Sequence, residues 1–185
     1  PVSEPVAVGR ADAYQLDLPG DALGVEVFLV RETGAPVAVD DAGESSGPSG
    51  TGAGSEAAGQ PTVRPRSSWG ARAYRGTPEV APYLRRAIVH HTVSTNAYSP
   101  GQVPSLLRSI QAYHQDARGW DDIGYNFVID RFGTLWQGRA GDMRTAVIGA
   151  HASNNNWGSV GVAFLGDATG SVTSAALTSY GRLIG

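Results

Sequence analysis

The chain has 185 residues, 41% of them hydrophobic, which suits one domain with a core and an appended segment. It has no cysteine, so disulfides and thiolate metal ligands are excluded. No apolar run approaches the roughly 18 residues of a membrane span, and we expect no signal peptide because the first residues lack its basic and apolar regions. Residues 1–64 contain ten acidic residues and three arginines, whereas residues 65–185 contain seven acidic residues and eleven arginines. A basic second part suits an anionic polymer such as cell wall or nucleic acid, and suits an ordinary solvated surface equally well.

The N-terminal third divides into a strand-forming segment and a linker. Residues 1–39 contain two strand-like runs, at 13–16 and 25–30, separated by the turn-forming Leu18–Asp21. We expect a β-rich segment here, too short to bury a core alone. Residues 40–60 contain six glycines, four serines, four alanines and four acidic residues. This composition predicts a flexible linker, because burial cannot offset the entropy lost on ordering it.

Residues 61–185 show the alternating patterns of a compact domain. Short apolar or alternating runs predict strands over residues 86–91, 123–129, 134–137 and 159–165, with a turn at Asp130–Gly133. Because the last of these strands is almost entirely apolar, we expect it at the centre of the sheet. In the second, Tyr125, Phe127 and Ile129 are expected to share one face.

Two helices are predicted from apolar residues at helical spacing. The first covers residues 102–117 and ends at Gly119, with an expected apolar stripe of Leu106, Ile110, Tyr113 and Ala117 and with Leu107 and His114 beside it. The second covers residues 173–184, with Leu177, Tyr180 and Ile184 on one side. Strands and helices alternate, so the fold class is predicted as α/β, a mixed central β-sheet flanked by helices.

The residues best suited to chemistry are four histidines and a tyrosine. The strand at 86–91 ends in His90 and His91, whose side chains face opposite ways if the strand is regular. Zinc hydrolases use three protein ligands and an activated water, so two histidines from different strand ends plus a third group would suit such a site. The candidates are His90, His91, His114, Tyr125 and His151, and a purely structural role is open for each, above all for His114 on the predicted helix.

The sequence gives little support for other classes of reaction. Gly158-Ser159-Val160-Gly161 lacks the pattern of a nucleophile elbow, so no Ser/His/Asp constellation has local support. There is no phosphate-binding loop and no cysteine-based metal motif. The aromatic and arginine residues are not clustered, so nucleic-acid binding rests only on the basic charge of the second part.

Several short motifs follow one another in a fixed order between residues 64 and 185. They are Arg66-Ser67-Ser68-Trp69-Gly70-Ala71, Ile88-Val89-His90-His91-Thr92, the block from Ile110 to His114 with Gly119 to Phe127, Gly138-Arg139, Gly149-Ala150-His151 with Asn156, and Val160 to Gly166. In order and spacing this series resembles the type-2 N-acetylmuramoyl-L-alanine amidase and peptidoglycan recognition protein family. The resemblance does not extend to residues 1–60.

The resemblance implies roles for individual residues. His90 matches the family's first zinc ligand, and Tyr125 matches a catalytic tyrosine near the zinc-bound water. The positions that line the groove for muramic acid and stem peptide are matched by His91, Thr92, His114, His151 and Asn156. A zinc ion as cofactor and peptidoglycan as partner are therefore expected. His151 matches a groove position and not a ligand.

The same resemblance implies that further zinc ligands follow the last helix, beyond residue 185. The domain at 61–185 is accordingly expected to be incomplete at its C-terminal end, and activity of this chain alone stays open. The function expected is zinc-dependent hydrolysis of the lactyl-amide bond between N-acetylmuramic acid and L-alanine; a non-catalytic peptidoglycan-binding module of the same fold is the alternative. We expect a monomer, secreted to the cell wall, with no membrane span and no nucleic acid as partner.

Overall fold

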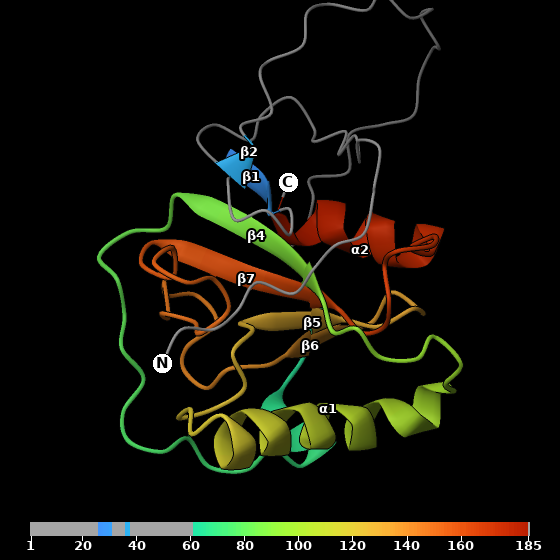
Figure 1. Ribbon diagram of the computed structural model, residues 1–185, viewed down its shortest axis with the longest axis horizontal. Helices are drawn as coiled ribbons and strands as arrows, with labels where there is room; N and C mark the ends of the chain where they lie inside the picture. Colours follow the sequence, from blue (N-terminus) through green and yellow to red (C-terminus); the bar gives the residue numbers. More distant parts are fainter. Residues whose placement is uncertain (1–25, 31–35, 38–60, 185) are drawn as a thin grey trace, which may run out of the picture.

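A mixed β-sheet forms the centre of the molecule, whose computed structural model describes residues 26–30, 36–37 and 61–184 (Figure 1). Its strands follow the order β2-β1-β4-β7-β5-β6-β3. Their bounds are β1 Glu26–Val30, β2 Pro36–Val37, β3 Val63–Arg64, β4 Arg86–His91, β5 Phe127–Ile129, β6 Leu135–Gln137 and β7 Ser159–Phe164. The predicted strand at 13–16 and the predicted linker at 40–60 lie outside the described residues.

Parallel pairing holds the middle of the sheet together. β7 lies between β4 and β5 and is parallel to both, while β6 returns antiparallel to β5. β1 is parallel to β4, and β2 is antiparallel to β1. The central position predicted for the apolar strand at 159–165 is confirmed, as is the hairpin turn before β6, where Gly133 N donates to Asp130 O.

The two α-helices cover opposite faces of the sheet (Figure 1). α1 (Val103–Ala112) follows a 3₁₀ turn, η2 (Pro100–Gln102), and continues into a π-helical turn, η3 (Tyr113–Ala117); α2 is Ser174–Ile184, and a further 3₁₀ turn, η1, is Arg66–Trp69. The predicted α/β fold, a mixed sheet flanked by helices, is confirmed. In the part of the chain that the structure describes, no helix has the length and apolarity that crossing a membrane requires.

Each face of the sheet has its own apolar core. On the α1 side, Trp69, Leu107, Val128 and Trp136 belong to one buried cluster. On the α2 side, a second cluster contains Ala87, Val162, Phe164 and Tyr180, with Val89 packed against it. Because side chains alternate along a strand, Ala87 and Val89 on the α2 side leave His90 on the α1 side.

The predicted apolar stripe of α1 is confirmed for Leu106 and Ile110, which pack against the α1-side core, but it is wrong for Tyr113 and Ala117, which are exposed. Tyr113 is 55% exposed, whereas Val103, Leu107 and Gln111 are buried. Polar Gln111 can lie on the buried face because its amide pairs with the backbone of Arg72, accepting from N at 2.8 Å and donating to O at 3.1 Å. In α2, the predicted Leu177 is likewise 40% exposed.

The predicted strand at 123–129 is also shorter than expected. Only Phe127–Ile129 pairs as β5, so the alternation assumed for Tyr125 does not hold. Phe127 and Ile129 lie in the α2-side core, as predicted for a shared face, but Tyr125 lies in the α1-side core with Val128. The irregular backbone before β5 thus turns Tyr125 toward the same side as His90.

Candidate active site

Four of the predicted residues meet on the α1 side of the sheet. Nε2 of His90 and Nδ1 of His151 lie 3.0 Å apart. The ring centroid of Tyr125 is 5.5 Å from that of His90 and 5.7 Å from that of His114. The end of β4, the π-helical turn, the segment before β5 and the loop before β7 therefore deliver one aromatic and imidazole cluster, which we call the His–Tyr cluster (His90, His114, Tyr125, His151).

His114 holds the chain that leads into Tyr125. Its Nδ1 accepts a hydrogen bond from Gly124 N at 3.1 Å, and its ring lies 4.6 Å from that of Trp120. Gly124 is required because a Cβ there would lie 2.4 Å from the carbonyl oxygen of Ala150. The ring of His114 is buried and its Nδ1 is occupied, which favours a role in the shape of the site.

His151 lies in a cradle between two glycines. A Cβ at Gly149 would lie 2.3 Å from its Cδ2, and a Cβ at Gly161 would lie 2.4 Å from the same atom. The loop around it is closed by Asn156, whose Oδ1 accepts from His151 N at 2.9 Å and from Ala152 N at 2.8 Å. The ring therefore has one fixed position, with Nδ1 directed at His90.

Burial sets the charge state of the cluster. It lowers the pKa of His90 to about 4, assisted by the neighbouring charge of His91, and lowers the pKa of His114 to about 4, assisted by Arg118 and Arg139. Burial also puts the pKa of His151 well below its ordinary value, and it raises the pKa of Tyr125 to about 12. At neutral pH the cluster consists of neutral imidazoles and a protonated phenol.

Acid is expected to destabilise the fold through these histidines. Their pKa values are lowered in the folded state, so the stability they contribute is complete above the unfolded value of 6.5 and is lost as pH falls toward about 4. For buried His114 the loss between pH 7 and pH 4 is roughly 3 kcal/mol. Urea unfolding at pH 7, 5.5 and 4 measures it, and His114→Gln reduces the slope. An unchanged slope in that variant would contradict the assignment.

The structure does not bring His91 to the cluster. Its ring is 1% exposed, and its Nδ1 accepts from Ala168 N at 3.0 Å on the other side of β4. The predicted opposite directions of His90 and His91 are confirmed. The His91 side chain contacts the segment after β7, and its predicted role in lining a groove stays a prediction. Thr92 likewise closes a turn, with Gly166 N donating to its Oγ1 at 2.9 Å.

The sequence did not indicate the polar residues that bind the backbone around the His–Tyr cluster. Asn126 donates from Nδ2 to Val147 O at 2.7 Å and accepts at Oδ1 from Gly161 N at 2.9 Å, joining the loop, β5 and β7. Arg139 is 8% exposed and donates to Ile123 O at 3.1 Å. A polar residue inside an otherwise apolar run was the available signal for Asn126.

The described residues do not complete a zinc site. Catalytic zinc sites use three protein ligands, and among residues 26–30, 36–37 and 61–184 no group of three histidine, cysteine, aspartate or glutamate side chains is placed to hold a metal ion. His90 and His151 are neutral and adjacent, but they are only two.

Comparison with known proteins identifies the family of this chain. The sequence model for N-acetylmuramoyl-L-alanine amidase (Amidase_2) matches residues 80–185. Peptidoglycan-recognition protein SC2 of Drosophila melanogaster is 40% identical over 66% of this chain and 65% of its own length. The N-acetylmuramoyl-L-alanine amidase of Mus musculus is 42% identical over 64% of this chain and 22% of its own length. The chain therefore spans less than two thirds of these relatives.

Solved structures show the same fold. Drosophila PGRP-LB has a TM-score of 0.57 and 36% identity, covering 66% of this chain and 71% of that one. Peptidoglycan recognition protein LE, solved in complex with tracheal cytotoxin, has a TM-score of 0.61 and 29% identity, covering 65% and 70%. The resemblance first noted in the ordered motifs is confirmed, and this chain belongs to the N-acetylmuramoyl-L-alanine amidase family.

Proposed function

We propose that this protein hydrolyses the amide bond between the lactyl group of N-acetylmuramic acid and L-alanine in peptidoglycan. The observation that carries the proposal is the convergence of neutral His90 and protonated Tyr125, with ring centroids 5.5 Å apart, in a chain of the amidase family. A neutral imidazole offers a lone pair, and a protonated phenol offers a hydrogen-bond donor. Amide hydrolysis uses both kinds of group.

Tyr125 has the properties of an oxyanion-stabilising donor. Its phenol stays protonated at neutral pH because burial raises its pKa to about 12. Within the described residues its hydroxyl has no hydrogen-bond partner, so the donor is not committed to the fold. When water attacks the lactyl carbonyl, negative charge develops on the carbonyl oxygen, and a positioned O–H stabilises that charge more than the ground state.

Zinc is part of the proposal as a cofactor, with His90 as one ligand. A bound zinc ion would supply an activated water near neutral pH. The other ligands would have to come from outside the described residues, because His90 and His151 alone fall short of three.

A non-catalytic peptidoglycan-binding module is the second candidate. The incomplete ligand set among the described residues favours it. Both candidates take the same ligand, and a solved relative, PGRP-LE, is in complex with a monomeric diaminopimelic acid-type peptidoglycan. Either function places the protein where peptidoglycan is, outside the cytoplasmic membrane.

Digestion of purified peptidoglycan distinguishes the two candidates. The chain is incubated with peptidoglycan plus Zn²⁺ or plus EDTA, and peptides with a free N-terminal L-alanine are measured by mass spectrometry. An amidase releases such peptides with zinc and not with EDTA, and His90→Ala abolishes release. A binding module releases none but binds a soluble muropeptide saturably in calorimetry. If the chain neither releases peptides nor binds the muropeptide, both functions are rejected.

A further inference from the structure

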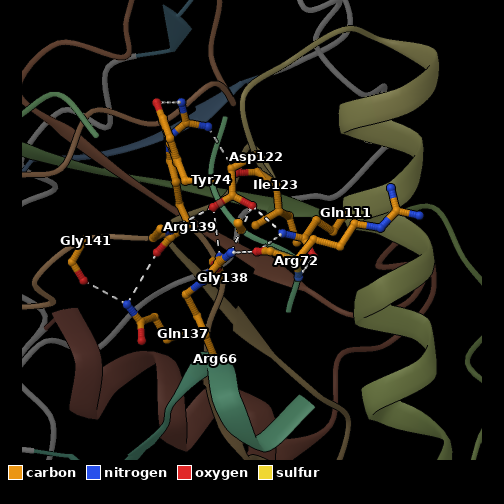
Figure 2. Close-up of polar contacts among 12 residues, drawn as sticks. Arg66, Arg72, Tyr74, Gln111, Asp122, Ile123, Gln137, Gly138, Arg139 and Gly141 are labelled. Atoms are coloured by element: carbon orange, nitrogen blue, oxygen red, sulfur yellow. Dashed lines mark hydrogen bonds and ion pairs between the residues drawn. The ribbon is translucent and has the colours of Figure 1, made fainter. Parts of the chain in front are cut away.

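Asp122 is the most deeply buried charge near the His–Tyr cluster. Its side chain is 0% exposed and forms an ion pair with Arg66 at 2.8 Å. Figure 2 shows Arg66 and Gln111, which extends from α1, converging on this carboxylate. Gln111 Nε2 donates to Oδ1 at 2.6 Å, and Ala140 N donates to Oδ2 at 2.9 Å. A buried charge is tolerated when it is paired and hydrogen-bonded in this way.

Every group that faces Asp122 in these contacts is a donor. Arg66 lies against both oxygens, Nη2 at 3.3 Å from Oδ1 and Nη1 at 2.8 Å from Oδ2. An asparagine at this position would direct its NH₂ group at Gln111 and Arg66 in one orientation, and at Arg66 and the Ala140 amide in the other. Only a carboxylate, which has acceptors alone, satisfies all of them.

The carboxylate also continues the pairing that fixes Tyr125. The segment 138–140 runs alongside the residues before β5 and donates hydrogen bonds to them. Its backbone donates from Gly138 N to Asn126 O and from Arg139 N to Tyr125 O, each at 2.9 Å. Arg139 Nη1 donates to Ile123 O at 3.1 Å, and Ala140 N donates to Asp122 Oδ2 at 2.9 Å. Residues 123–126 are irregular, so these bonds replace a strand ladder. The side chain of Asp122 supplies the last acceptor.

We propose that Asp122, neutralised by Arg66, is a positioning residue for the Tyr125 hydroxyl. This inference rests on the proposed function, in which the Tyr125 hydroxyl donates a hydrogen bond to the reacting carbonyl of the substrate. Asp122 does not belong to the His–Tyr cluster, and the bonds of segment 138–140 connect it to Tyr125. Small displacements of a positioned group lower a rate steeply, by about 10²-fold for about 1 Å.

Asp130 provides a matched control for a substitution of Asp122. It is 1% exposed and accepts three hydrogen bonds, from Phe132 N, Thr134 N and Trp136 Nε1, each at 2.9 Å. It lies in the β5–β6 turn and contacts no member of the His–Tyr cluster. Asp122→Asn and Asp130→Asn therefore make the same chemical change at buried carboxylates that differ in their connection to Tyr125.

The experiment compares both variants with the wild-type chain, below their melting temperatures. We expect Asp122→Asn to lower kcat for muropeptide cleavage by about 10²-fold with KM changed less than about twofold, and to shift the ring resonances of Tyr125, assigned by their loss in Tyr125→Phe. Asp130→Asn is expected to lower the melting temperature while leaving kcat and these resonances unchanged. Equal kcat in the two variants, with unshifted Tyr125 resonances, would overturn the proposal.

A milder change keeps the proposal testable if Asp122→Asn does not fold. Arg66→Lys keeps the positive charge but loses the planar fork that contacts both oxygens. It is expected to shift the Tyr125 resonances in the same direction and by less, and unshifted resonances in this variant would count against the proposal. A wild-type chain without hydrolytic activity would reject the proposed function, whereas the Tyr125 resonances would still decide the role of Asp122.

Discussion

Tyr125→Phe is expected to lower kcat for stem-peptide release by about 10²–10³-fold, the loss found when one oxyanion donor is removed. The hydroxyl lies in the His–Tyr cluster, where burial keeps it protonated. Because the hydroxyl has no hydrogen-bond partner among the described residues, its removal leaves no group of the fold unsatisfied. We therefore expect the free energy of unfolding to change by less than about 0.5 kcal/mol. Steady-state kinetics on a soluble muropeptide and urea unfolding measure the two quantities.

Tyr98 is the matched control for this substitution. It too is a buried tyrosine, but its hydroxyl donates to Leu165 O at 2.6 Å and accepts from Arg131 N at 2.9 Å. Tyr98→Phe is expected to cost about 1–3 kcal/mol of stability because it leaves buried backbone groups unpaired, and to leave kcat unchanged. A Tyr125→Phe variant with full kcat would remove the phenol from the reaction.

Patterns set by the backbone were predictable from the sequence. The strand at 86–91 is β4 to the residue, and the apolar run at 159–165 is central because both its faces are covered by helices. Strand alternation predicted that His90 and His91 diverge, and they do. The helix after Gln102 ends before Gly119, whose φ of 69° is a left-handed conformation that glycine adopts readily.

Patterns set by long-range polar contacts were not predictable. Gln111 and Gln115 lie on the buried face of the first helix, but hydropathy assigns amides to the surface and therefore predicts a stripe that includes Tyr113. Gln115 is buried because its Nε2 donates to Ala73 O and Asp121 O, each at 2.9 Å. Ala73 lies 42 residues from Gln115, and Arg72, the partner of Gln111, lies 39 residues from it, so the local sequence pattern does not indicate either contact.

Long-range contacts also explain why the sequence does not indicate the polar residues that support the site. Asp122 directly follows Asp121, and nothing in the neighbouring sequence indicates which of the two carboxylates is buried. Asp121 accepts from the Tyr74 hydroxyl at 3.4 Å near the surface, whereas Asp122 is enclosed. The ordered motifs identified the residues of the His–Tyr cluster, but only three-dimensional packing shows which charge lies behind them.

Gly161→Ala is expected to destabilise the fold by about 3 kcal/mol, the upper end of the range for overpacking. The new Cβ would lie 2.4 Å from Cδ2 and Cγ of His151, and Gly149 packs so closely on the same ring that a Cβ there would lie 2.3 Å from Cδ2. The backbone of Gly161 is regular strand in β7, so conformational strain does not contribute. Gly181→Ala in α2 is the control, because a Cβ there meets nothing within 4 Å. It is expected to be neutral or stabilising.

The double variant Gly161→Ala/His151→Ala tests whether the clash itself causes the loss. Removal of the imidazole opens the space that the new methyl group needs, so the two substitutions are expected to be non-additive, with about 1–3 kcal/mol recovered in the double-mutant cycle. The cycle is measured by urea unfolding at pH 7, where His151 is neutral because its pKa lies well below the ordinary value. Strict additivity would mean that Gly161 is required for a reason other than the His151 ring. The recovered stability cannot restore the 3.0 Å contact with His90, since that contact needs the imidazole. Stability and activity are therefore expected to separate in the double variant: the fold regains part of its free energy of unfolding, and the ring of His90 loses its fixed partner.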